Sequence, residues 1–218
     1  MGPKQDIREV LVSRLYAGSA VMAIVGLLGV SAYILVFADR GNDPFAKCRS
    51  SAIATGGEQI GGPFTLVDQS GVTVTEAQVF DKPALVYFGY TSCTDVCPLD
   101  NARNAQAVDI LEEQGFEVAP VFISIDPERD TPAVMADYGS AIHPRMVALS
   151  GSAAQVKAAA AAYRVYYKAQ PADVGGYEMD HSTFTYLVLP KIGFVEFFRR
   201  EATADQVANS AVCFIQSE

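Results

Sequence analysis

Residues 88–98 read FGYTSCTDVCP, and this stretch decides the fold that we expect. The apolar run before it, residues 84–87, predicts a buried strand, and the residues after Pro98 predict a helix. Cys93 and Cys97 therefore lie at a strand-to-helix turn, where α/β scaffolds carry function. Because proline favours the first helical position, Cys97 is expected at or beside the N-cap, where the helix dipole stabilises a thiolate. The alternative is a pair of packed or permanently disulfide-bonded cysteines.

Residues 15–38 contain no charged side chain and exceed the roughly 20 residues that cross a bilayer as a helix. A cleavable secretory signal is the alternative, but its apolar core is only roughly 7–15 residues long. We therefore expect a single transmembrane helix preceded by a cytoplasmic tail, residues 1–14. Basic residues flank the span almost equally, so its orientation rests on the cysteines, whose chemistry suits an oxidising compartment outside the cytoplasm.

Residues 39–61 are rich in small and polar residues without periodicity and are expected to form a tether. Residues 62–218 alternate strand and helix patterns and end in a predicted hairpin at 184–198, which indicates an α/β fold with a mixed sheet flanked by helices. Before this hairpin we expect an edge strand at 165–169 and a loop at 171–179. Capping sequences predict helix starts at Thr131, Ser152 and Thr203. The net charge of −9 argues against a nucleic-acid partner.

The chain has two histidines. His143 lies between a predicted helix and strand, where a solvated or capping role is expected. His181 lies in a loop that enters a strand, from which it can reach the edge of the sheet that carries Cys93 and Cys97. Two thiolates and an imidazole form a soft site with three ligands, which Cu(I) tolerates, whereas iron–sulfur clusters and structural zinc usually require four. The same thiols can instead close into a disulfide, so metal binding and redox chemistry are alternative states.

Three segments in this order resemble the Sco/SenC family of copper chaperones: residues 88–98, the sequence SIDPERDTP at 124–132, and DHS at 180–182. The likeness runs from about Gly62 to the C-terminus, and the N-terminal anchor is similar to the architecture of the family. Thr94 departs from the proline of many members, but this change removes no ligand.

The resemblance implies a thioredoxin-like fold with a hairpin insertion. It also implies that Cys93, Cys97 and His181 bind copper as Cu(I) or Cu(II), and that the task is assembly of the binuclear copper centre in cytochrome c oxidase subunit II. Asp180 is then expected in the second shell, orienting His181 or its loop, and the alternative is a turn-forming aspartate.

Two further cysteines, Cys48 and Cys213, lie outside these motifs. We predict that they form a structural disulfide that fixes the tether to the last helix, and a closed loop of this length contributes on the order of 4–5 kcal/mol in the chain-entropy model. The alternative is two separate buried or free thiols.

Two functions share the predicted site. The first is a membrane-anchored copper metallochaperone for oxidase assembly. The second is an enzyme, a thiol–disulfide oxidoreductase that reduces the copper-ligand cysteines of the same subunit. A peroxidase is disfavoured because no arginine is evident beside the thiol. Asp6 and Glu9 are atypical of a mitochondrial transit peptide, so we expect a bacterial plasma membrane with the C-terminal domain on the periplasmic side.

Overall fold

The computed structural model describes residues 22, 24–33, 44–49, 60–172 and 175–218. It divides into two compact units, Met1–Pro44 and Phe45–Glu218. In the first unit the described residues form a helix at 22 and 24–33. The predicted transmembrane helix, residues 15–38, otherwise lies outside the described residues. In the part of the chain that the structure describes, no helix has the length and hydrophobicity needed to cross a membrane.

The second unit is built on one mixed sheet of seven strands. In spatial order the strands are β2 (Thr73–Thr75), β1 (Thr65–Asp68), β5 (Val147–Ser150), β4 (Ala119–Ser124), β3 (Ala84–Gly89), β8 (Thr185–Leu189) and β9 (Gly193–Phe198). Strands β3, β4 and β5 run parallel, and the remaining pairings are antiparallel. Every residue of β3 and β4 is buried, because both faces of the sheet are covered, as their apolar runs predict.

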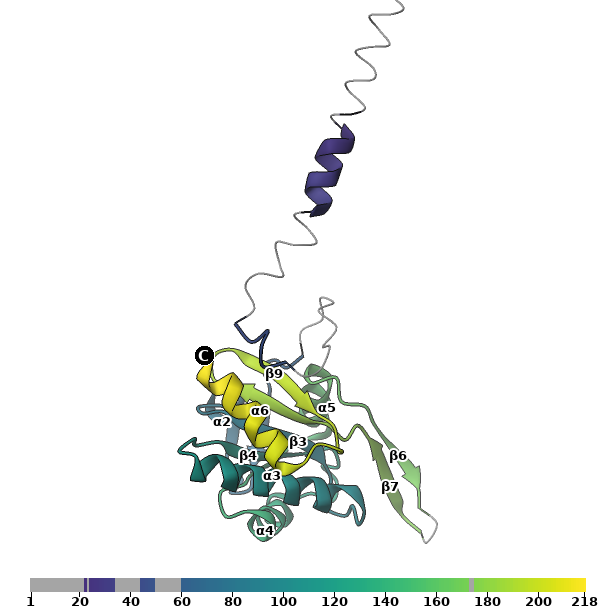
Figure 1. Cartoon of the computed structure of the whole chain (residues 1–218). Coiled ribbons are helices and arrows are strands. Elements are labelled where there is room, and N and C mark those ends of the chain that lie inside the picture. Colours follow the sequence, from purple (N-terminus) through teal and green to yellow (C-terminus); the bar gives the residue numbers. More distant parts are fainter. Residues whose placement is uncertain (1–21, 23, 34–43, 50–59, 173–174) are drawn as a thin grey trace, which may run out of the picture. The chain divides into compact units, whose positions relative to one another are not determined.

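Helices cover both faces of this sheet. They are α2 (Glu76–Val79), α3 (Val96–Glu113), α4 (Pro132–Ile142), α5 (Ala153–Ala162) and α6 (Ala204–Gln216). Figure 1 shows α3 and α6 packed side by side over one face, where Leu85 and Leu187 join their apolar residues in one core cluster. On the other face, Met135 of α4 and Val156 of α5 pack with Val86. This is the thioredoxin-like arrangement that the resemblance implies.

Local sequence signals position most helix starts. Thr131 accepts a hydrogen bond from the backbone of Val134, and Ser152 and Thr203 each form a capping box, so all three predicted caps are confirmed. The start of α3 differs from the prediction that Pro98 would be the first helical residue. The helix begins at Val96, two residues before Pro98. Proline is tolerated there because N–H groups in the first helical turn have no intrahelical partner. Cys97 therefore lies inside the first turn.

A second, two-stranded sheet is formed by β6 (Tyr167–Pro171) and β7 (Tyr177–His181). Figure 1 shows this hairpin extending from the body of the domain. The predicted loop at 171–179 is therefore wrong at Pro171, which ends β6, and at residues 177–179, which belong to β7, and His181 is the last residue of a strand. Glu178 and Asp180 are exposed while their neighbours are half-buried, which is the alternation of a strand with one covered face.

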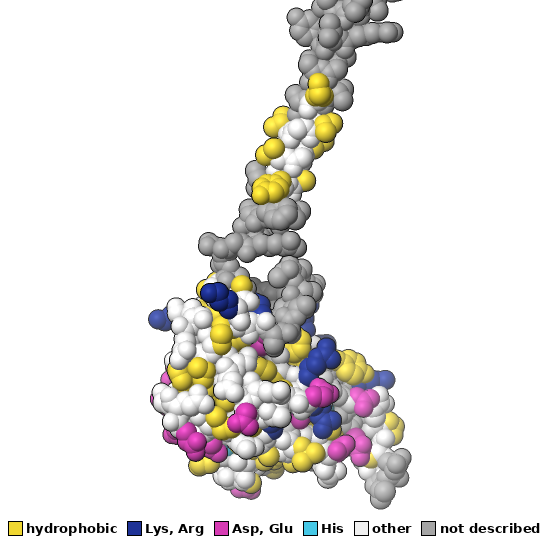
Figure 2. Space-filling view, viewed as in Figure 1, with side chains coloured by type: hydrophobic (Ala, Val, Ile, Leu, Met, Phe, Trp, Pro, Cys, Tyr) yellow, Lys and Arg dark blue, Asp and Glu magenta, His cyan; other side chains and the backbone are white. Residues whose placement is uncertain are grey.

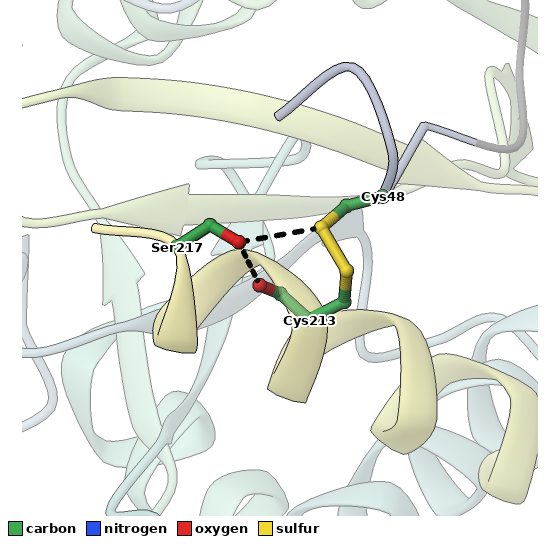
Figure 3. Close-up of a disulfide and its surroundings, with 3 residues drawn as sticks. All are labelled: Cys48, Cys213 and Ser217. Atoms are coloured by element: carbon green, nitrogen blue, oxygen red, sulfur yellow. Dashed lines mark hydrogen bonds between the residues drawn. A yellow bond between two sulfur atoms is a disulfide. The ribbon is translucent and has the colours of Figure 1, made fainter. Parts of the chain in front are cut away.

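A disulfide joins Cys48 to Cys213, with a Cα–Cα distance of 5.6 Å. Figure 3 shows it between the segment before the sheet and α6, where the Ser217 hydroxyl donates to the Cys213 carbonyl at 2.8 Å. Phe45, 5% exposed, packs its ring 5.4 Å from that of Phe214. Residues 45–49 of the predicted tether therefore belong to the folded domain.

The surface of this domain is mixed in character. On the face drawn in Figure 2, acidic, basic and hydrophobic side chains are interspersed. Scattered apolar side chains are normal for a protein surface and need no partner to cover them.

Candidate metal centre

The topology brings three segments to one edge of the sheet. Strands β3 and β4 are parallel and end together, with Gly89 opposite Ser124. Strand β8 runs antiparallel to β3 and begins at this edge, where Thr185 pairs with Tyr87. The cysteine turn after β3, the loop after β4 and the end of β7 before β8 therefore converge, in the position where open α/β sheets bind their ligands.

Cys93, Cys97 and His181 meet at this edge. Their ligand atoms all lie within 4.8 Å of one another, and Cys97 Sγ is 3.4 Å from His181 Nε2. Both cysteines are free thiols. Cys97 is fully buried, Cys93 is 9% exposed and His181 is half-buried. The structure thus brings together the three residues that the sequence singled out, although His181 is 84 residues from Cys97 along the chain.

The hydrogen bonds of the three residues indicate which of their ligand atoms carry a proton. His181 Nδ1 lies 2.8 Å from the Ser182 carbonyl, which can only accept, so Nδ1 carries the proton. When the imidazole is neutral, Nε2 then keeps a free lone pair that can bind a metal, and it lies 3.4 Å from Cys97 Sγ. A hydrogen bond from the Cys97 thiol lowers the pKa of Cys93 to about 3, aided by backbone N–H groups such as that of Cys97, 3.4 Å from the Cys93 sulfur. The same interaction with Cys93, together with burial, raises the pKa of Cys97. Cys93 is therefore a thiolate and Cys97 holds the proton.

Two tyrosine rings enclose the imidazole. The Tyr87 and Tyr90 ring centroids lie 6.2 and 5.9 Å from that of His181, and both rings are edge-on to it. The Tyr87 hydroxyl donates to the buried carboxylate of Asp100 at 3.0 Å. Burial raises the pKa of Tyr87, and it raises that of Tyr90 to about 12, so both phenols stay protonated. The sequence did not single out these residues, since aromatic residues beside a buried strand are typical of any core.

Gly89 leaves the space that the Cys97 sulfur occupies. A Cβ atom at this position would lie 3.0 Å from Cys97 Sγ and 3.0 Å from ring atoms of Tyr87 and Phe122. Contacts this short force a neighbour to shift. Glycine therefore allows the close approach of the thiol to β3, and a side chain here would displace Cys97 Sγ or a neighbouring ring by a few tenths of an ångström.

Asp130 holds the cysteine turn in place. Its carboxylate is fully buried and accepts from Thr91 N at 3.2 Å, Thr91 Oγ1 at 2.6 Å and Ser124 Oγ at 2.6 Å. Burial raises the pKa of Asp130, against the lowering effect of these hydrogen bonds. Asp130 was not predicted as a site residue, although it lies in the segment 124–132 that resembles the family. A carboxylate placed just after a buried strand was the available signal.

Two other residues were given expected roles by the sequence. Asp180 accepts from Gln170 Nε2 at 3.0 Å on the exposed face of the hairpin that carries His181, whereas the imidazole itself is hydrogen-bonded to the Ser182 carbonyl. The reason is strand alternation, which directs consecutive side chains to opposite faces. His143 caps the C-terminus of α4, as one of its expected roles requires, but it is buried rather than solvated and lies 3.2 Å from Asp109 Oδ1.

Comparisons with known proteins converge on one family. The SCO1/SenC family model matches residues 53–216. The protein SenC of Rhodobacter capsulatus is 45% identical over 205 residues, covering 94% of this chain and 92% of that protein. The crystal structure of Arabidopsis thaliana ScoI with copper bound has a TM-score of 0.71 and 39% identity over 73% of this chain and 99% of that one. The structure of Bradyrhizobium japonicum ScoI with copper bound has a TM-score of 0.64 and 40% identity over 70% and 98% of the two chains.

Proposed function

This chain belongs to the SCO1/SenC family, and on that premise we propose that it is a copper metallochaperone. Cys93, Cys97 and His181 are the residues that hold the metal cargo. The observation that carries the proposal is their convergence, with the ligand atoms of two free thiols and one imidazole all within 4.8 Å of one another. Two thiolate ligands and one imidazole suit Cu(I). The copper-bound ScoI structures of two relatives support this choice.

The proposed task is assembly of the binuclear copper centre of cytochrome c oxidase subunit II. We further propose that residues 15–38 anchor the chain in a bacterial plasma membrane and that the C-terminal domain faces the periplasm. The uncharged run in the sequence and the long match to a bacterial SenC protein support this assignment. An anchored chaperone would meet a membrane-bound recipient at the same surface.

The geometry suits transfer by ligand exchange. Three donors leave copper open to a further ligand, so a recipient thiol can add before a chaperone ligand leaves. His181 comes from the two-stranded hairpin, whereas Cys93 and Cys97 follow β3 of the main sheet. Movement of the hairpin therefore releases one ligand without disturbing the buried core. Cys97, which is fully buried, is the ligand placed to hold the ion longest.

A second function is favoured by the arrangement of two free thiols four residues apart, in which Cys93 Sγ accepts from Cys97 N at 3.4 Å and the pKa of Cys93 is lowered. The thiolate is the nucleophile of thiol–disulfide exchange. Cys93 would attack a disulfide of the recipient and form a mixed disulfide, releasing one recipient thiolate. Attack by Cys97, after loss of its proton to solvent, would close Cys93–Cys97 and release the second thiolate. The recipient then gains two electrons and this chain loses two.

Copper titration of the reduced full-length chain in detergent tests the chaperone. We expect one copper per chain, and an affinity at least about 100-fold lower in Cys93→Ser, Cys97→Ser and His181→Ala, since even residues behind the ligands cost about 10–100-fold. The Cys48→Ser/Cys213→Ser variant is the control, because it also removes two sulfurs but should keep the copper. Unchanged affinity in any of the three site variants would refute the ligand set. His181→Ala should retain any disulfide-reducing activity, which separates the two functions.

A further inference from the structure

The loop between β4 and α4 contacts the histidine hairpin through Asp126 and Arg129. The Tyr177 hydroxyl donates to Asp126 Oδ1 at 2.7 Å, and Arg129 Nη1 donates to the Tyr177 carbonyl at 2.9 Å. Arg129 Nε is also hydrogen-bonded and ion-paired with Asp126. The Arg129 guanidinium carbon lies 3.9 Å from the centroid of the Tyr177 ring, within the range of a cation–π contact. One arginine thus holds both the backbone and the ring of the first residue of β7.

The same loop contacts the cysteine turn. The Arg129 guanidinium carbon lies 5.6 Å from the centroid of the Tyr90 ring, and Tyr90 in turn contacts His181. Next to Arg129, Asp130 binds the backbone and hydroxyl of Thr91. The loop therefore touches both segments that supply the metal ligands.

The hairpin depends on contacts of this kind. Among the described residues, β6 and β7 pair only with each other, so no ladder of backbone hydrogen bonds fixes them to the main sheet. Tyr177, Met179 and His181 share the covered face of β7. A strand rises about 3.3 Å per residue, so Tyr177 fixes the strand roughly 13 Å from His181. Holding Tyr177 therefore limits the direction in which the strand delivers the imidazole.

We infer that Arg129 is a positioning residue, which sets His181 against the two cysteines by clamping Tyr177 to the loop after β4. The inference rests on the proposed copper-binding function, because it concerns the same three ligands. A planar guanidinium can donate to a carboxylate and a carbonyl while stacking on a ring. Lysine has the same charge but lacks this fork. If only positive charge near the site mattered, lysine would replace arginine without loss.

The test compares Arg129→Gln and Arg129→Lys with Arg145→Gln in the full-length chain in detergent. Arg145 is the matched control, because it pairs with Glu112 through a partly exposed ion pair away from the trio. We expect both Arg129 variants to bind copper about 10–100-fold more weakly, the cost typical of residues that orient ligands. Their Cu(II) electron paramagnetic resonance spectra should lose the nitrogen coupling and match that of His181→Ala. Arg145→Gln should match the wild type in both measurements.

A second variant, Tyr177→Phe, covers the case in which the Arg129 variants do not fold. It removes only the hydroxyl that binds Asp126 and keeps the ring under Arg129, so we expect a loss of affinity smaller than that of Arg129→Gln. Wild-type affinity and nitrogen coupling in Arg129→Gln would overturn the inference and leave the copper site intact. The same result in Tyr177→Phe would overturn it if Arg129→Gln is unfolded. Wild-type behaviour of Arg129→Lys would assign the effect to charge and also overturn it.

Failure of the proposed function gives a different result, because the wild type itself would then bind no copper. The inference is still tested in the metal-free chain. The rings of Tyr87 and Tyr90 lie against the imidazole, so the NMR signals of His181 report its position. We expect these signals to move in Arg129→Gln and to stay unchanged in Arg145→Gln. Unchanged signals in Arg129→Gln would overturn the inference without any metal.

Discussion

Removal of the Cys48–Cys213 disulfide should destabilise the domain more than any other change to its cysteines. The bond closes a loop of 165 residues, which restricts the unfolded chain. In the chain-entropy model a loop of this length contributes about 5 kcal/mol, and measured losses for native disulfides are about 2–5 kcal/mol. For a domain of this size each kcal/mol corresponds to about 2–4 °C in Tm. The Cys48→Ala/Cys213→Ala variant should therefore melt roughly 5–20 °C below the wild type.

Thermal unfolding in detergent, followed by circular dichroism with and without reductant, measures this effect. Reductant should lower the Tm of the wild type to that of the double variant, and it should leave the double variant unchanged. Cys93→Ser/Cys97→Ser is the control. It removes two cysteines that are not cross-linked and keeps the Cys48–Cys213 disulfide, so its Tm should still fall when reductant is added. The Tm of Cys48→Ala and of Cys213→Ala should each fall as far as that of the double variant, because either change removes the same disulfide. A double variant that melts with the oxidised wild type would refute the reasoning.

Two further predictions concern the site and the N-terminal segment. Because the pKa of Cys93 is lowered to about 3, its alkylation by iodoacetamide in the metal-free chain should show no increase between pH 5 and about 9, the range where an ordinary thiol becomes reactive. Mass spectrometry should find the label on Cys93 before the fully buried Cys97, and a rise centred near pH 8–9 would contradict the thiolate. If residues 15–38 span a membrane, the full-length chain should stay with membranes washed at alkaline pH. A chain lacking residues 1–38 should be released, and release of both would contradict the anchor.

The sequence predicted those elements whose signals are local. The apolar run at β3, the turn with two cysteines and the capping residues Thr131, Ser152 and Thr203 each depend on a few neighbouring residues. For that reason they could be identified without knowledge of the tertiary structure. The Cys48–Cys213 pairing followed from exclusion of the other two cysteines, and the structure contains it.

Strand β7 and the supports of the site could not be identified in this way. The alternation of Tyr177, Met179 and His181 with two acidic residues is a strand pattern, but it is only five residues long, and the glycines and acidic residues around it are equally typical of a loop; its pairing with β6 identifies it as a strand. Arg129 and Tyr177 are separated by 48 residues, and their contact exists only because the hairpin returns to the edge of the sheet. No local pattern encodes such a contact, so these two residues could not be paired before the tertiary structure was known.

The disulfide also constrains how the chain can mature. In chain order Cys48 is the first cysteine and Cys213 the last, whereas Cys93 and Cys97 emerge between them during synthesis. An oxidant that acted on the growing chain would find only the metal-site thiols as partners for Cys48. Native pairing therefore requires Cys48 to remain reduced until α6 has been made, or a wrong bond to be reshuffled afterwards. The chain must finish with one cysteine pair oxidised and the other reduced, so the thiols that we propose to bind copper are also those most exposed to error during biogenesis.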